Sequence, residues 1–143
     1  MAITQSLCTS FKVDLLAGTM DFTSGTGDTF KMALYTSSAT LGPTTTAYST
    51  TNEISGAGYT AGGNTLTVSQ SPTSGGTTAF ISFSNTTWNS ASFTCRGALI
   101  YNSSQSNKAV AVFDFGSDKT VVGGSFTVSF PTADATSAVI RIA

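Results

Sequence analysis

The spacing of apolar residues changes once along this chain, near residue 28. Within residues 4–17, apolar side chains recur about every 3.6 positions, which is the spacing of one stripe on a helix. Gly18 follows, and glycine commonly ends helices because it tolerates a left-handed backbone. The pattern predicts a short amphipathic helix at about residues 4–17, with Thr4 or Ser6 as its N-cap.

From residue 28 onward, apolar and polar residues alternate with the two-residue period of half-buried strands. The strands expected from this alternation are 28–36, 64–70, 78–83, 92–101, 108–115, 123–130 and 138–142. Segments rich in Gly, Pro, Asn, Ser and Asp separate most of them and are expected as turns, at 71–76, 85–89, 102–107, 116–119 and 131–137. Residues 41–52 are mostly Thr and Ser, and we expect them to form a long exposed loop.

Many short strands separated by turns are typical of a sandwich or barrel closed by antiparallel pairing. We therefore predict a mainly β fold: an antiparallel β-sandwich, immunoglobulin-like or jelly-roll-like, with about seven or eight strands and one N-terminal helix. The length of 143 residues suits a single domain spanning 1–143. No block recurs at a fixed period, which argues against a solenoid or a propeller.

Charged residues make up only 9% of the chain, against roughly 25% in an average protein, and Ser and Thr take their place. A surface so poor in charge indicates that much of the molecule lies against other protein. The alternative, a hydroxyl-rich surface without functional meaning, stays open. The net charge of −1 and the scattered basic residues disfavour nucleic-acid binding. We expect neither a membrane span nor a signal peptide, because no long apolar run and no basic leader are present.

The chain contains no histidine, which removes the commonest general base and the commonest ligand of transition metals. Its seven acidic residues show no paired spacing, so we predict no catalytic residues, no metal site, no cofactor and no enzymatic activity. Asp114, Asp118 and Asp134 lie near turns, where carboxylates usually accept backbone hydrogen bonds; a calcium site is the minor alternative. Cys8 and Cys95 are expected as free, buried thiols, although one bridge between them is conceivable.

Four glycines lie within residues 53–63, where they give the backbone freedom for turns or for the close approach of another chain. Six residues in and near this segment are candidates for an interface with another protein: Tyr48, Gly56, Gly58, Tyr59, Gly62 and Gly63. Core packing or turn geometry explains each of them almost as well. Aromatic residues could also form a platform for sugars, but the alternation places most of them in the core: Phe80, Phe83, Trp88 and Tyr101.

Three segments, residues 28–63, 96–104 and 108–116, together resemble a family of small virion proteins of tailed bacteriophages. The resemblance covers nearly the whole chain, and it implies a structural place in the particle rather than a reaction. It favours a capsid decoration or cement protein of the virion, assembled in the host cytoplasm. The implied partners are the major capsid protein and further copies of this chain. The alternative is a tail, neck or fibre-associated protein with a structural or a receptor- or glycan-binding role.

Overall fold

Antiparallel strands dominate the computed structural model, which describes residues 2–143. A single helix, α1 (Thr9–Leu16), precedes most of the strands in this described part of the chain. The strands are β1 (Ser6–Leu7), β2 (Phe30–Tyr35), β3 (Asn64–Thr65), β4 (Val68–Gly75), β5 (Thr78–Phe83), β6 (Thr86–Asn102), β7 (Lys108–Val128) and β8 (Ile140–Ile142). The predicted mainly β fold with one short N-terminal helix is confirmed.

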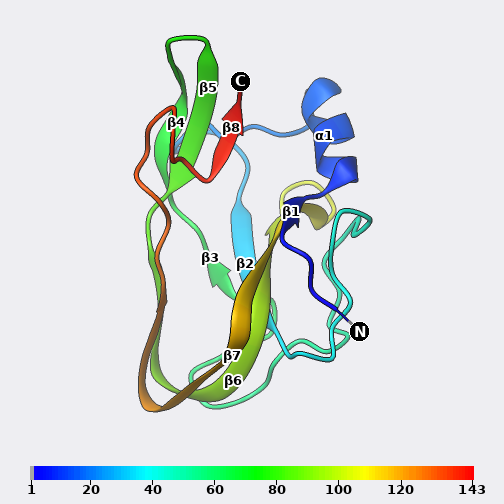
Figure 1. Cartoon of the computed structure of the whole chain (residues 1–143), viewed down its shortest axis with the longest axis vertical. Helices are drawn as coiled ribbons and strands as arrows, with labels where there is room; N and C mark the ends of the chain where they lie inside the picture. Colours follow the sequence, from blue (N-terminus) through cyan, green and yellow to red (C-terminus); the bar gives the residue numbers. More distant parts are fainter. Residues whose placement is uncertain (1) are drawn as a thin grey trace.

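The strands form two antiparallel sheets, which make a β-sandwich as predicted (Figure 1). One sheet has five strands in the order β1-β7-β6-β2-β3, and the other has three in the order β4-β5-β8. β6 and β7 form a ribbon of 17 and 21 residues that curves at one end of the molecule, so that its far part runs back towards the three-stranded sheet (Figure 1). By hydrogen-bonded pairing, both strands of the ribbon belong to the five-stranded sheet.

The length of this ribbon contradicts two predicted turns, at 85–89 and 116–119. β6 already begins at Thr86, and β7 continues through the second segment without reversing. Gly116 has a positive φ of 81°, and the pairing register shifts opposite it, between Cys95 and Gly97. The glycine therefore serves a bulge, which needs the same backbone freedom as a turn but bends the strand without reversing it.

The helix is shorter than predicted, because its expected first turn belongs to a strand. Ser6 and Leu7 pair with β7, and the backbone N–H of Cys8 donates to Val110 O at 2.9 Å. Cys8 is the N-cap and makes no side-chain capping bond, so the predicted caps at Thr4 and Ser6 were wrong. The predicted end is confirmed: Gly18 follows the helix with a φ of 76°.

The region before β5 also departs from the predicted pattern. The strand expected at 64–70 is divided between β3 and β4, and the turn expected at 71–76 lies mostly inside β4. β4 tolerates Pro72 because it is an edge strand, where a missing N–H costs no ladder hydrogen bond. The chain reverses only after Gly75, at Gly76, which has a φ of 61°.

Aromatic side chains fill much of the core between the layers. Phe22 stacks on Phe30 with ring centroids 4.4 Å apart, and both rings lie near Phe83. Most of the aromatic residues considered for a sugar platform are buried, namely Phe83, Trp88 and Tyr101, while Phe80 is half-buried. These three side chains are core residues and present no exposed stacking surface.

Both cysteines are free and buried, as predicted. Burial raises the pKa of Cys8 to about 11 and that of Cys95 to about 12, so both thiols stay protonated at neutral pH. No helix in residues 2–143 is long and apolar enough to cross a bilayer.

Candidate interaction surfaces

The predicted exposed loop, residues 41–52, and the Gly-rich segment 53–63 together form one loop that is tied to the five-stranded sheet at several points. Within the Thr-rich part, which is largely exposed as expected, Thr46 O accepts from Ala109 N at 3.0 Å. Further along, Tyr48 N donates to Asn107 O at 2.9 Å, and Ile54 N donates to Leu34 O at 3.0 Å. The loop therefore has a defined position against β2 and the β6–β7 hairpin.

The carboxylate of Glu53, the only glutamate in the chain, organises this loop. Its Oε1 accepts from the Tyr48 hydroxyl at 2.7 Å. Its Oε2 accepts from the Tyr59 hydroxyl at 2.5 Å and from the backbone N–H of Gly62 at 2.7 Å. The hydroxyl of Tyr59 in turn accepts from Leu34 N at 3.0 Å, so the carboxylate is linked to the backbone of β2.

The other two tyrosines extend the same cluster from the sheet. The Tyr101 hydroxyl on β6 donates to Gly62 O at 2.7 Å, and its ring stacks on that of Tyr48 with centroids 4.6 Å apart. On β2, the Tyr35 hydroxyl donates to Ser49 O at 2.7 Å. All four tyrosines of the chain thus hold the loop to the sheet around Glu53; we call this group the tyrosine cluster.

The environment of the tyrosine cluster keeps its hydroxyls protonated. Burial is the main reason that the pKa of Tyr101 rises to about 12, and the nearby charge of Glu53 adds to it. The pKa values of Tyr35, Tyr48 and Tyr59 also rise, first through burial and then through Glu53. A protonated hydroxyl can donate, and the bonds of the four hydroxyls to Glu53, Ser49 O and Gly62 O each require that hydroxyl to donate.

We expect the protein to lose stability steeply above pH 10. Unfolded tyrosines release their protons near pH 10, whereas the folded ones hold theirs, so the unfolded state binds fewer protons and rising pH favours it. The stability from the four hydroxyls is complete below pH 10 and is lost as pH rises towards and beyond 12. Tyrosinate absorbance and circular dichroism should change together in one cooperative step. Ionisation of all four tyrosines near pH 10 with an intact fold would contradict this expectation.

Three of the four candidate glycines lie directly against neighbouring backbone. A β-carbon on Gly58 would lie 2.7 Å from Asn89 O, and one on Gly63 would lie 2.8 Å from Ala33 Cα. A β-carbon on Gly56 would overlap the carbonyl oxygen of Ser92. These glycines are therefore required for the packing of the loop on β2 and β6, and an additional role in an interface stays a prediction.

Two of the three carboxylates considered for a cation, Asp114 and Asp134, instead hold a bulge and a turn, while Asp118 is exposed on β7. Asp114 accepts from Gly116 N at 2.9 Å and pairs with Arg96 Nε at 3.1 Å. Asp134 accepts from the backbone of Thr136 and Ser137. The backbone hydrogen bonds lower the pKa of both carboxyls. Residues 2–143 contain no group of three or more His, Cys, Asp or Glu placed to hold a metal ion.

The outer edge of β7 is the longest strand edge without a partner in residues 2–143. On this side β1 pairs with Ala111 and Val112, and residues 46 and 47 contact Lys108 and Ala109; from Phe113 onward β7 pairs with β6 alone. Val122, in this open part, is 83% exposed. An edge of this kind offers unpaired backbone donors and acceptors to another chain.

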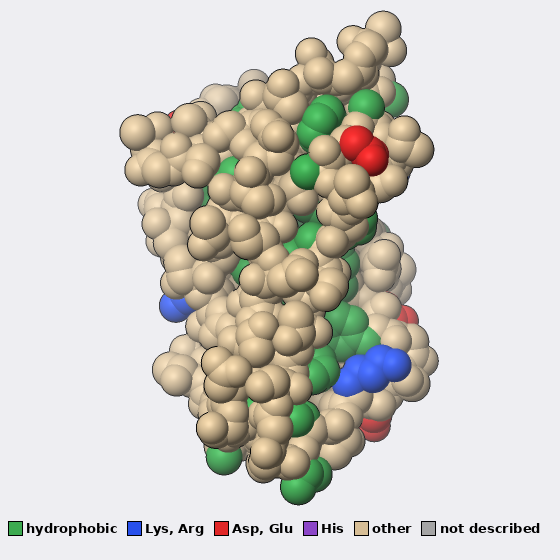
Figure 2. Space-filling view, turned by 90° about the vertical axis from the view of Figure 1, so that its left-hand side faces the viewer, with side chains coloured by type: hydrophobic (Ala, Val, Ile, Leu, Met, Phe, Trp, Pro, Cys, Tyr) green, Lys and Arg blue, Asp and Glu red, His purple; other side chains and the backbone are tan. Residues whose placement is uncertain are grey.

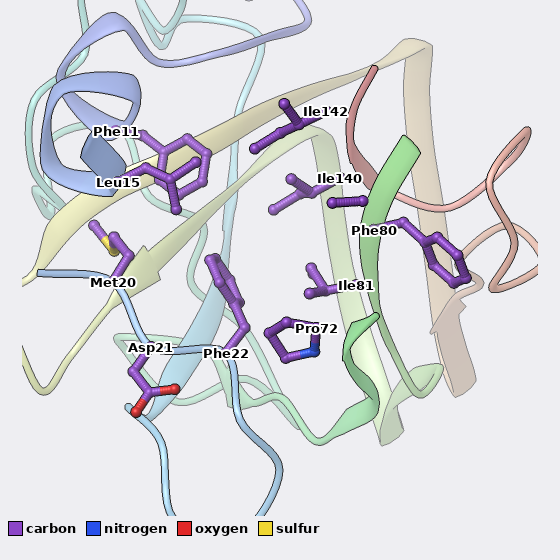
Figure 3. Close-up of a pocket in the computed structure, with 11 residues that line it drawn as sticks. Phe11, Leu15, Met20, Asp21, Phe22, Pro72, Phe80, Ile81, Ile140 and Ile142 are labelled. Atoms are coloured by element: carbon purple, nitrogen blue, oxygen red, sulfur yellow. The ribbon is translucent and has the colours of Figure 1, made fainter. Parts of the chain in front are cut away.

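A second surface feature is an apolar cavity between α1 and the three-stranded sheet (Figure 3). Phe11 and Leu15 enter it from α1, while Ile140 and Ile142 face it from β8. Its volume is about 170 Å³, and Asp21 is the only charged residue in its lining. Neither this cavity nor the edge of β7 was predicted from the sequence.

Comparisons of the chain with protein-family models, with curated proteins and with solved structures give no match. The strands and the helix of the structure define its class, which is an antiparallel β-sandwich with one short N-terminal helix.

Proposed function

We propose that this chain is a non-enzymatic structural protein of a bacteriophage particle that decorates and reinforces the head shell. The observation that carries the proposal is a charge-poor outer surface bordered by the open edge of β7. The resemblance of the three sequence segments to virion proteins supplies the setting. The proposed partners are the major capsid protein and further copies of the chain.

The few charges of the chain are partly used internally, which leaves a neutral surface for contacts. Of six basic and seven acidic residues, Arg96 pairs with Asp114 at 3.1 Å and Lys108 pairs with Asp14 at 3.2 Å. Figure 2 shows a face on which backbone and uncharged polar groups predominate, with apolar side chains visible between them. A neutral surface of this kind binds through hydrogen bonds and apolar contact, so salt should weaken the binding little.

The open edge of β7 differs from the other strand edges in its length, although the bulge at Gly116 interrupts it. β1, β3 and β8 have only two or three residues, and the edge strand β4 carries Pro72 and two register shifts. Proteins use short length, proline and bulges in this way to prevent unwanted strand pairing. β7 is long, so its open edge can pair with another chain. In a shell of many repeated copies, many modest contacts at this edge would together attach the protein firmly.

A reconstruction of the native particle tests this function. We expect regularly spaced copies on the head shell, and particles without the protein should lose resistance to heat and osmotic shock. Val122→Lys should prevent incorporation while leaving the thermal unfolding of the isolated protein unchanged, because the side chain is exposed. Thr44→Lys, an equal charge change in the exposed loop, is the matched control and should incorporate normally.

Two results would refute the role in the shell. Copies found only in the tail, neck or fibres would replace it with the alternative location. Unchanged heat and osmotic resistance of particles that lack the protein would remove the reinforcing role. A hollow lined by Tyr35 and by residues 40–52, most of them Thr, Ser or Asn, favours the glycan-binding alternative, and binding of the purified protein to a glycan array would support it.

A further inference from the structure

We infer that the apolar cavity between α1 and the three-stranded sheet is a binding site for a small, uncharged, apolar molecule of about the size of benzene. A ligand site of this kind goes beyond the proposed function, because it needs neither the open edge of β7 nor a partner protein. Three properties of the cavity carry it. Its walls are fixed by the core, one small residue leaves the space open, and no polar side chain of the described residues points into it.

The walls of the cavity are held in place by the core. Phe11 on α1 and Phe22 beyond the helix are buried, and their rings meet edge-on with centroids 6.0 Å apart. Phe22 also stacks on Phe30 of β2, so both rings belong to the packing between the layers. On the opposite wall, Ile81 and Ile140 are buried as well. The space is therefore largely preformed, as small-molecule sites usually are.

One small side chain on the sheet leaves the space open. β5 and β8 pair with Ala79 opposite Ile142 and with Ile81 opposite Ile140, and all four residues line the cavity. The ring of Phe80, between Ala79 and Ile81, points away from it, as the alternation of a strand requires (Figure 3). Three of the four paired positions carry isoleucine, and only position 79 carries a side chain too small to reach across. A larger residue there would fill the space, so the alanine keeps it free.

The inner surface of the cavity offers no partner for a charge. Asp21 is the only charged residue in the lining, and its carboxylate points away from the space and accepts from Thr23 N at 2.9 Å (Figure 3). An apolar cavity of about 170 Å³ gives water few hydrogen bonds and holds an apolar molecule of about the size of benzene. A charged ligand would lose its hydration there without gaining a partner. A long acyl chain is larger than the space, so a compact molecule is the ligand that fits.

Titration of the full-length protein with benzene, followed by methyl NMR, tests the site. We expect a dissociation constant on the order of 1–10 mM, because a single small ring buries a modest apolar area. Nuclear Overhauser effects should connect benzene with the methyl groups of Ile81, Ile140 and Ile142, which face the cavity (Figure 3). Benzoate, which is the same ring with a charge, should bind at least about tenfold more weakly.

Two variants with the same substitution distinguish the cavity from the rest of the surface. Ala79→Phe places a ring in the space from an exposed lining position on β5 and should weaken benzene binding at least about tenfold. Ala61→Phe adds the same ring at an exposed alanine outside the lining and should leave benzene binding unchanged. Thermal unfolding should show that both variants remain folded.

Four results would each overturn the inference. They are no binding of benzene to the wild type, Overhauser effects only to residues outside the lining, an equal loss of binding in both variants, and benzoate binding as tight as that of benzene. The Overhauser effects and the benzoate comparison need only the wild type, so they decide the outcome even if Ala79→Phe does not fold. The particle reconstruction is independent of all these measurements, so the ligand site and the proposed function can fail separately.

Discussion

Replacing Gly63 with alanine is expected to prevent folding, or to lower the free energy of unfolding by at least about 4 kcal/mol. The backbone of Gly63 has a φ of 78°, and a β-carbon there would overlap the carbonyl oxygen of Met32 and lie 2.5 Å from its carbonyl carbon. Met32 is fully buried in β2, which pairs with β6 on one side and β3 on the other. β2 therefore has no room to move away.

Gly18→Ala is the matched control for this prediction. Gly18 has nearly the same φ, 76°, but no atom lies within 4 Å of the position of its β-carbon. Gly18→Ala should lower the free energy of unfolding by about 1 kcal/mol, which is the cost of the left-handed backbone alone. Chemical denaturation of both variants measures the difference. Equal losses would show that backbone conformation, and not the contact with β2, explains the need for glycine at position 63.

The strands with clear alternation could be predicted because a period of two residues is a local property of the sequence. β2 and β5 lie where the alternation predicts strands, although burial alternates only over the first three residues of each. The strand Ser6–Leu7 was missed because its structure depends on pairing with β7, more than 100 residues away, while its local spacing fits a helix. Gly116 was assigned to a turn because a bulge and a turn require the same backbone freedom. The sequence alone does not distinguish them.

In the candidate site as well, residues close together in the sequence could be predicted, and residues brought together only by the fold could not. Tyr48, Tyr59 and the nearby glycines were singled out because they are close together in the sequence. Tyr35 was not, and Tyr101 was considered only for a sugar platform, because these two lie on β2 and β6 and reach the loop only through the fold. The one local signal for the tyrosine cluster was a single glutamate between two tyrosines, and the part played by Glu53 went unrecognised.

Glu53→Ala is expected to lower the free energy of unfolding by about 3 kcal/mol, because it leaves three donors without their acceptor. These donors are the hydroxyls of Tyr48 and Tyr59 and the backbone N–H of Gly62. Water can reach the half-buried tyrosines, which limits the loss, but Gly62 is buried. Glu53→Gln keeps an oxygen acceptor at the same place and should cost about half as much. Urea denaturation at pH 7 measures both.

A double-mutant cycle with Tyr59→Phe tests whether the loss comes from these hydrogen bonds. If the Tyr59 hydroxyl acts through Glu53, its removal costs about 1 kcal/mol or more in the wild type and much less once Glu53 is alanine. Asp118→Ala removes an equal charge from an exposed position and should change stability by less than about 0.5 kcal/mol. Additive losses in the cycle would mean that Glu53 stabilises the loop by packing or net charge, and the tyrosine cluster would then not be the link between loop and sheet.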